Sequence, residues 1–184
     1  MTPKAALTRY VAFLRALNVG GHIVKMDRLR KCFEALRLTD VKTFIASGNV
    51  LFDSPERDTA ALELRIAGYL EKQLGYEVAT FVRSAAEVRR IAEATPFPAS
   101  AGASGAGTSI YVGFFQKPLS PAARKSVLAL GTADHEFHAD PRELYWLCRI
   151  SVLDSNVSWS KLEKMLGPAT FRNANTVRRI AATL

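Results

Sequence analysis

The stretch VKTFIASGNVLF, residues 41–52, decides the fold of this chain. It contains two β-rich runs, residues 41–47 and 49–52, which pivot at Gly48. Two such runs joined at a glycine are typical of a tight hairpin or of a bulged pair of strands. We therefore expect two neighbouring strands here, with the rest of the first half arranged around them.

Helical patterns flank this strand pair on both sides. Before it, apolar residues recur from Met26 to Leu36 at the spacing of an amphipathic helix. After it, Asp58 can cap a helix that continues through Leu74 and stops at Gly75. The first half is completed by expected strands at residues 9–17 and 78–82 and by a helix that the capping box Ser84–Glu87 opens.

The second half repeats this order of elements. We expect strands at residues 110–115, 136–138, 144–150 and 169–172, and helices that begin at Ser120, at a capping box Ser160–Glu163, and at Asn173 or Asn175. Each half then reads β-α-β-β-α-β with one helix appended. The sequence therefore predicts an α+β fold made of two ferredoxin-like halves.

The segment between the halves has a composition of its own. Residues 99–108 are rich in Ala, Gly and Ser and carry no bulky side chain, which is typical of a flexible loop. We accordingly divide the chain into a first ferredoxin-like half at residues 1–98, a flexible Ala/Gly/Ser loop at residues 99–108, and a second ferredoxin-like half at residues 109–184.

The chain is basic, with a formal net charge of +8 and a pI of about 9.8. A positive net charge of this size attracts nucleic acid, phosphorylated metabolites or acidic membranes. Alternatively, it only makes molecules of the protein repel one another and so keeps them in solution. No run of about 18 apolar residues is present, so we expect no membrane span and no membrane partner. Cys32 and Cys148 lie far apart and fit no redox or metal spacing, which favours two reduced cysteines and a cytoplasmic location.

Familiar signatures of catalysis are missing from the sequence. It contains neither the Gly-rich phosphate and dinucleotide loops nor the Gly-x-Ser-x-Gly nucleophile elbow, and the aromatic strand signature of RNA-recognition motifs is absent. His135 and His138 are three positions apart on an expected strand, so they should face opposite sides of the sheet. We therefore expect no metal site and no cofactor.

Polar residues at the ends of expected strands form the candidate binding site. Arg15 interrupts an apolar run just before Asn18, Gly20 and Gly21, and a charge in such a run is costly unless it is paired. A second segment combines a guanidinium with amides at the start of the last helix, where free backbone amides favour an anion. This second segment adds Arg172, Asn173 and Asn175 to the candidate site. The turn at Gly48 adds Ser47 and Asn49.

A structural role for the same residues is the alternative. Arg15 can pair with a carboxylate inside the fold, Asn18 and Asn49 can hold turns, and either Asn173 or Asn175 can cap the helix. The binding interpretation requires instead that the guanidinium groups of Arg15 and Arg172 meet beside the glycine pair.

Three segments of the chain resemble those of a known family. Residues 10–21, YVAFLRALNVGG, are similar to its Arg-Gly-Ile-Asn-Val-Gly-Gly opening, residues 47–52 to its Ser-Gly-Asn-Val-hydrophobic-Phe segment, and residues 172–177 to its Arg-Asn-Trp-Asn-Thr-Val ending. The family is a bacterial one, catalogued as a domain of unknown function. The resemblance implies two ferredoxin-like or RNA-recognition-like halves and brings no established activity, cofactor or partner. Ala16 stands where the family usually has Gly, and Ala174 where it has Trp.

The leading functional hypothesis is a cytoplasmic binding protein for an anionic ligand, either a phosphorylated small molecule or nucleic acid. The first alternative is a small enzyme that uses the same polar residues, although these segments contain no His or carboxylate to act as a general base. The second is an interaction module without a ligand. The sequence leaves the oligomeric state open.

Overall fold

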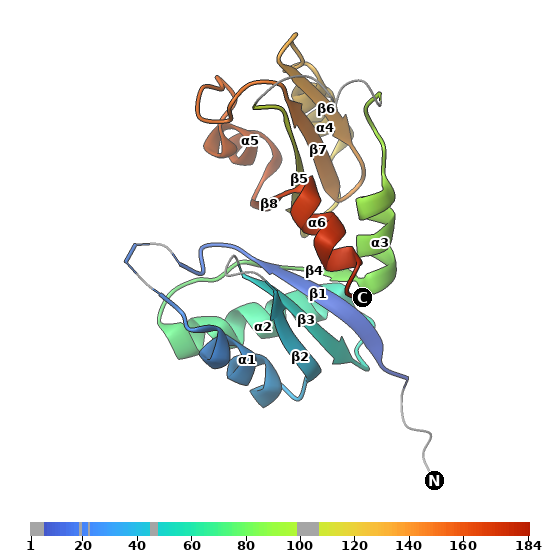
Figure 1. Ribbon diagram of the computed structural model, residues 1–184. Coiled ribbons are helices and arrows are strands. Elements are labelled where there is room, and N and C mark those ends of the chain that lie inside the picture. The colour runs from blue at the N-terminus through green and yellow to red at the C-terminus, as the bar shows by residue number, and fades with distance from the viewer. Residues whose placement is uncertain (1–5, 19, 22, 45–47, 99–106) are drawn as a thin grey trace. The chain divides into compact units, whose positions relative to one another are not determined.

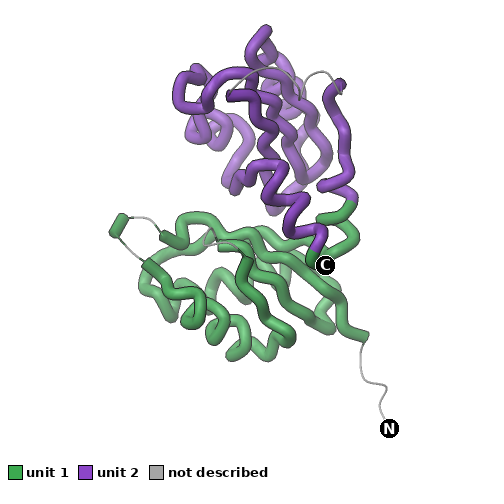
Figure 2. Tube along the Cα trace, in the orientation of Figure 1, with its two compact units in different colours: residues 1–89, 183–184 green, residues 90–182 purple. Residues whose placement is uncertain are grey.

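The computed structural model describes residues 6–18, 20–21, 23–44, 48–98 and 107–184. The chain divides into two compact units, which Figure 2 shows in different colours. Unit 1 comprises residues 1–89 with Thr183 and Leu184, and unit 2 comprises residues 90–182. Ser47 of the candidate site and residues 99–106 of the expected flexible loop lie outside the described residues.

Unit 1 contains one four-stranded antiparallel sheet in the order β2-β3-β1-β4 (Figure 1). Its elements in chain order are β1 (Thr8–Leu14), α1 (Met26–Ala35), β2 (Thr39–Phe44), β3 (Asn49–Ser54), α2 (Thr59–Leu74), β4 (Thr80–Ser84) and the start of α3 (Ala85–Glu93). Strands β2 and β3 are the expected neighbouring pair, and their register shifts between Thr39 and Lys42.

The core of unit 1 lies on the sheet face that α1 and α2 cover. Alternate residues of β1, among them Tyr10 and Ala12, pack with Phe33 of α1 and Ile66 of α2. Asp58 caps α2 by accepting hydrogen bonds from the amides of its first turn. Gly75 ends the helix in the left-handed conformation, at φ +84°, so both predicted ends of this helix are confirmed.

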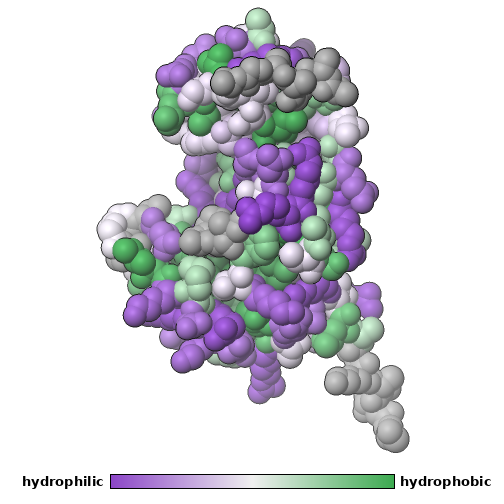
Figure 3. Space-filling view, in the orientation of Figure 1, coloured by the Kyte–Doolittle hydropathy of each residue, from purple (hydrophilic) through white to green (hydrophobic). Residues whose placement is uncertain are grey.

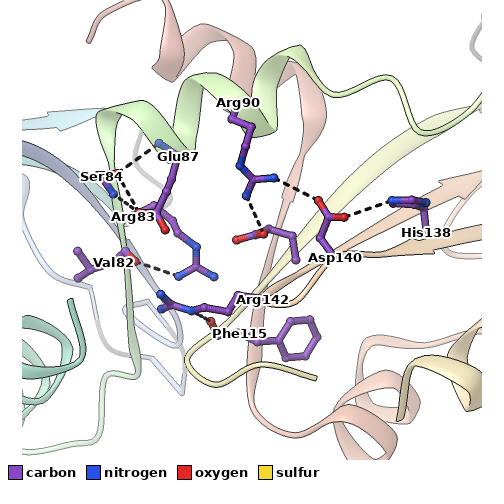
Figure 4. A network of polar contacts seen from close by, with 10 residues as sticks. Val82, Arg83, Ser84, Glu87, Arg90, Phe115, His138, Asp140 and Arg142 are labelled. Carbon is purple, nitrogen blue, oxygen red and sulfur yellow. Dashed lines mark hydrogen bonds and ion pairs between the residues drawn. The ribbon is translucent and has the colours of Figure 1, made fainter. Parts of the chain in front are cut away.

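Helix α3 begins at the predicted capping box. The Glu87 carboxylate accepts a hydrogen bond from the Ser84 amide at 2.7 Å, and the Glu87 amide donates to the Ser84 hydroxyl oxygen at 3.3 Å. Figure 4 shows this reciprocal pair at the end of β4. Two backbone amides that would lack a partner at the helix end are thereby satisfied.

Unit 2 repeats the architecture with the sheet order β6-β7-β5-β8. Its further elements are β5 (Ser109–Phe115), α4 (Pro121–Leu128), β6 (His135–Ala139), β7 (Glu143–Cys148), α5 (Trp159–Leu166), β8 (Ala169–Asn173) and α6 (Ala174–Ala181). The predicted α+β class with two βαββαβ halves, each followed by a helix, is confirmed. Ser120 caps α4 as predicted, but α5 begins after Ser158 rather than at the expected Ser160–Glu163 box.

The core of unit 2 is a cluster of aromatic rings on the face covered by α4 and α5. Trp146 is fully buried and its ring centroid lies 5.0 Å from that of Trp159, which in turn lies 4.7 Å from Phe171. A Cβ atom added to Gly113 would lie only 2.5 Å from Cε1 of Phe171. The Phe171 ring therefore occupies the place where a side chain on β5 would stand.

One further expectation is settled by the described residues. His135 is buried beside Trp146 and His138 is half exposed on the other face, as the strand spacing predicted. Within the described ranges, no helix has the length and hydropathy needed to cross a membrane.

Candidate functional site

The face of the unit 2 sheet opposite α4 and α5 carries a row of chemically distinct side chains. Val112 of β5 pairs in register with Tyr145 of β7 and with Arg172 of β8, and Tyr145 pairs with His138 of β6. These four residues alternate with the residues of the aromatic core, so they share the opposite face. Helix α6 lies against this face, as Figure 1 shows.

An apolar cavity of about 170 Å³ lies beside this row. It is formed by the end of α3 and the segment after it, by β5 and β7, and by α6. The lining residues that the argument uses are Ile110, Val112, Tyr145, Ala174, Val177 and Arg178. All of them belong to unit 2, so the cavity is complete within one unit.

Tyr145 lines this cavity, and its hydroxyl oxygen is buried. The residue is only 2% exposed, and no described residue forms a hydrogen bond with its hydroxyl oxygen. Burial raises the pKa of Tyr145, and the nearby carboxylates of Asp140 and Glu143 raise it further. The phenol therefore remains protonated at neutral pH and can donate a hydrogen bond.

A network of ion pairs holds the turn that precedes Tyr145 (Figure 4). Arg90, at the end of α3, donates to the Asp140 carboxylate at 3.2 Å and to the Glu143 carboxylate at 3.1 Å. His138 lies 3.3 Å from the other oxygen of Asp140. These contacts tie α3 to the β6–β7 turn and so fix two walls of the cavity.

A polar pocket of about 190 Å³ adjoins the apolar cavity at the start of α6. Its wall includes Thr108 and Ser109 of one segment and Asn173, Asn175 and Arg178 of the other. Of the two predicted caps, Asn173 is the one that caps α6, because its side chain accepts a hydrogen bond from the Asn175 amide at 2.9 Å. The Arg178 guanidinium donates to the Asn175 side-chain oxygen at 2.8 Å. The start of α6 thus combines backbone amides with a cation.

Arg172 precedes this pocket on β8 but does not line it. Its guanidinium turns back along its own strand and donates to the Thr170 hydroxyl at 2.8 Å and to the Phe171 carbonyl at 2.9 Å. Burial lowers the pKa of Arg172 to about 10, because the charged form loses hydration. The group still carries a full positive charge at neutral pH.

The candidate residues of the first segment lie in unit 1. Strand β1 ends at Leu14, earlier than the expected residue 17, so Arg15 follows the strand and is half-buried instead of lying within it. The Leu14 amide donates to the Gly48 carbonyl at 2.7 Å, which brings the Arg15 segment and the start of β3 to the same end of the sheet. Arg15 and Arg172 belong to different units, and their predicted meeting stays a prediction.

Asn18 and Asn49 have hydrogen bonds that close loops. The Asn18 side chain accepts from the Val24 amide at 3.0 Å, across the exposed loop that contains Gly20 and Gly21. The buried Asn49 side chain donates to the Phe44 carbonyl at 3.0 Å and so joins the ends of β2 and β3. These bonds support the structural alternative for both asparagines.

Backbone conformation explains several residues of this loop. Gly20 and Gly21 adopt positive φ angles of +62° and +84°, which glycine tolerates without strain. Ala16 also has a positive φ, +62°, where a side chain is unfavourable. The resemblance places glycine at this position, and the left-handed backbone is a physical reason for it.

Sequence reasoning missed two residues of the unit 2 site. The sequence places Tyr145 only within the expected strand at residues 144–150, since no sequence signal separates a paired from an unpaired hydroxyl. Arg178 lies three positions after Asn175 on α6, and this helical spacing could have placed it beside the cap. Among the described residues, no group of three or more His, Cys, Asp or Glu side chains could hold a metal ion.

Comparisons with known proteins agree with this architecture. The model of a family described as "Protein of unknown function (DUF1697)" matches residues 7–145, which span unit 1 and unit 2 as far as Tyr145. The structure of a conserved bacterial protein from Streptococcus pneumoniae is similar, with a TM-score of 0.72 and 24% identity, and the alignment covers 97% of this chain and 99% of that one. No curated protein matches the chain.

Proposed function

The chain belongs to the DUF1697 family of proteins of unknown function. We propose that it is a binding protein for a small anionic molecule. The anion is held in the polar pocket at the start of α6. The observation that carries this proposal is that one concave pocket gathers Asn173, Asn175 and Arg178 around a helix N-terminus.

Three features of α6 favour an anion at this position. The helix has no acidic residue in its first turn, so no carboxylate there competes with an anion, and the Asn173 side chain occupies only the Asn175 amide. Its aligned peptide dipoles place partial positive charge at its start. Arg178 adds a cation on the pocket wall. Figure 3 shows strongly hydrophilic side chains gathered on the outward side of this helix.

Arg172 contributes at longer range. Because it is largely desolvated, its charge is screened less than that of an exposed arginine. Its guanidinium lies on the Thr170 side of the strand, so its charge acts on the start of α6 through space and not by direct contact. The overall charge of +8 has the same sign and favours encounter with anions.

The shape of the site favours a small molecule over nucleic acid. Small-molecule sites are concave and contain a few convergent polar groups, whereas nucleic acid is bound along extended basic surfaces. The polar pocket, at about 190 Å³, has the size of a single anionic group with its immediate neighbours. A phosphorylated or carboxylated metabolite fits this description.

Titration with inorganic phosphate tests the proposal, with the α6 amides followed by NMR. We expect saturable shifts at residues 174–178 in the wild type. Arg178→Gln should weaken binding about fivefold, since a charge-assisted contact is lost. The matched control is Arg179→Gln, because Arg179 is the next residue, is equally exposed and does not line the pocket. Absence of saturable shifts, or equal effects of the two variants, would contradict the anion site.

A further inference from the structure

The helical layer of unit 2, formed by α4 and α5, carries an excess of positive charge. Its two helices contain four basic residues and one acidic residue: Arg124, Lys125, Lys161, Lys164 and Glu163. The Glu163 carboxylate accepts a hydrogen bond from the Ala169 amide at 3.3 Å, so it is engaged within the unit. Lys117, in the segment before α4, adds one more exposed cation. Among the described residues, none forms an ion pair with Lys117 or with the three exposed lysines of the two helices.

The corresponding layer of unit 1 has nearly balanced charge, although its order of elements is the same. Helices α1 and α2 contain five basic and four acidic residues. Arg30, for example, lies 3.2 Å from the Asp27 carboxylate and 3.7 Å from the Glu34 carboxylate. The excess in unit 2 is therefore not a requirement of the βαββαβ architecture. It is a property of this surface, and it attracts negatively charged partners.

An apolar groove of about 320 Å³ lies within this basic layer. It is formed by the segment before α4, the first turn of α4 and the end of α5, and its volume falls in the range of ligand pockets. Its wall residues are mainly apolar and include Phe115, Pro118, Leu119, Met165 and Leu166. Lys117 belongs to the same wall, so a cation borders the apolar surface directly.

Both walls of the groove are held by backbone hydrogen bonds. On one side, the Leu119 amide donates to the Pro141 carbonyl at 2.6 Å. On the other side, the Gly167 amide donates to the Glu163 carbonyl at 2.8 Å and so fixes the end of α5. A groove that is formed before binding needs little ordering when a partner enters it.

We propose that this surface docks an acidic peptide segment of a protein partner, in which one large apolar side chain enters the groove between flanking carboxylates. The unpaired lysines supply the charge complementarity, and the groove supplies a place for the apolar side chain. None of the residues that line the groove also lines the polar pocket at α6. The inference therefore goes beyond the proposed anion site and does not depend on it.

The same features favour a peptide over single-stranded nucleic acid. Sites for single strands combine cations with exposed aromatic rings on which bases stack. In this layer the Trp159 ring packs against the rings of Trp146 and Phe171, and Phe115 is buried. The groove thus offers aliphatic side chains and a methionine to its occupant, which suit an apolar side chain.

Two short synthetic peptides of equal charge test the groove. One has a leucine between pairs of glutamates, and the other has an alanine in place of the leucine. Their affinities are measured at low ionic strength, where charges are screened least, by NMR titration at the amides of Gln116, Ala123 and Met165. The leucine peptide should bind about tenfold more tightly, because only its side chain fills the groove.

Two variants with the same change of charge test the basic layer. Lys161 lies one helical turn before Met165 of the groove wall, so Lys161→Glu places a carboxylate beside the groove. It should weaken both peptides about fivefold, and a carboxylate in the first turn of a helix is compatible with folding. Lys31→Glu is the matched control, since Lys31 is an exposed lysine of α1 in unit 1 and should leave both affinities nearly unchanged.

A third variant tests the groove without a change of charge. Ala123 lines the groove and is half-buried, so Ala123→Leu places a larger side chain there. Leucine is also well tolerated in a helix. In this variant the two peptides should bind with nearly equal affinity, because the leucine peptide loses its place.

Each contrary outcome identifies which part of the inference is wrong. Equal affinity of the two peptides for the wild type would show that the groove takes no side chain. Equal effects of Lys161→Glu and Lys31→Glu would show that the peptides respond to net charge alone. Tighter binding of a single-stranded oligothymidylate at the same amides would assign the surface to nucleic acid. Any of these results overturns the inference, and titration with phosphate at α6 is unaffected by all of them.

Discussion

Tyr145 and Arg172 stand on either side of Val112 in one row across the second sheet, because Val112 pairs in register with both. With adjacent strands about 4.8 Å apart, the two residues are separated by roughly 10 Å. One supplies a neutral donor to the sheet face and the other a permanent cation. The two differ in how their side chains are satisfied: the Arg172 guanidinium has hydrogen bonds along its own strand, and the Tyr145 hydroxyl has none among the described residues.

Removal of the Tyr145 hydroxyl should not lower the stability of the ligand-free protein. Tyr145→Phe is expected to leave the free energy of unfolding unchanged or to raise it by up to about 1 kcal/mol, because an unpartnered polar atom is removed. Tyr10→Phe is the matched comparison: Tyr10 is 3% exposed and donates to the Glu56 carbonyl at 2.8 Å. The free energy of unfolding of Tyr10→Phe, measured in urea, should be about 1 kcal/mol lower than that of the wild type. Equal losses in both variants would show that Tyr145 has a structural partner.

Alkaline pH should destabilise the wild type more than Tyr145→Phe. The unfolded tyrosine ionises near pH 10, whereas burial and two carboxylates raise the pKa of Tyr145 in the folded state. The folded state then retains a proton that the unfolded chain releases, so stability falls as the pH rises above about 10. Urea unfolding of both proteins at about pH 8 and about pH 11 measures the difference. Parallel pH dependence of the two proteins would contradict the raised pKa.

Ala16→Gly should stabilise unit 1. Ala16 has a φ of +62°, and a side chain in this left-handed region is unfavourable by about 1 kcal/mol. The reverse change is the control: Gly21 has a φ of +84° and no atom within 4 Å of an added Cβ, so Gly21→Ala introduces backbone strain alone. The midpoint temperature of thermal unfolding should rise for Ala16→Gly and fall by a similar amount for Gly21→Ala. Movement in the same direction would reject the backbone explanation.

The buried pair Glu63–Arg83 gives unit 1 a strongly coupled interaction. Glu63 accepts from the Val82 amide at 2.8 Å and lies 3.8 Å from the guanidinium of Arg83, which is fully buried. Glu63→Ala should lower the free energy of unfolding by about 3 kcal/mol, because it removes a carboxylate that faces the buried guanidinium. The double variant Glu63→Leu/Arg83→Met should recover most of this loss in a double-mutant cycle. Additive losses would show that the two residues act independently.

Much of the fold could be predicted because its signals are local. The cap at Asp58, the stop at Gly75 and the reciprocal pair Ser84–Glu87 depend on residues within one helical turn, and the structure has all three. The start of α5 could not be placed in this way, since Ser160 and Glu163 have the spacing of a capping box but Ser158 is the cap. Packing decides between them: Trp159 opens the helix and is held by Trp146 and Phe171.

The candidate site was only partly predictable, because some of its residues have local sequence signals and others depend on packing between distant segments. Asn173 and Asn175 were identified from their position before the last helix, and both line the polar pocket. Tyr145 depends on a neighbourhood built from three segments distant in sequence, so its unpaired hydroxyl has no sequence signature. Asn18 and Asn49 were predicted as site residues but have hydrogen bonds that close loops. The sequence alone does not distinguish a polar residue near a glycine that closes a loop from one that binds a ligand.

Gly113 has a consequence that reaches through the sheet. Phe171 lies across this glycine on the helix-covered side, and two residues later the same strand delivers Asn173 to the start of α6. A Cβ atom at position 113 would overlap the Phe171 ring, so Gly113→Ala should force that ring to move within the aromatic core. Under the proposed function, the packing of Gly113 against Phe171 on one face of the sheet would help to set the position of Asn173, two residues further along β8, at the anion pocket on the other face.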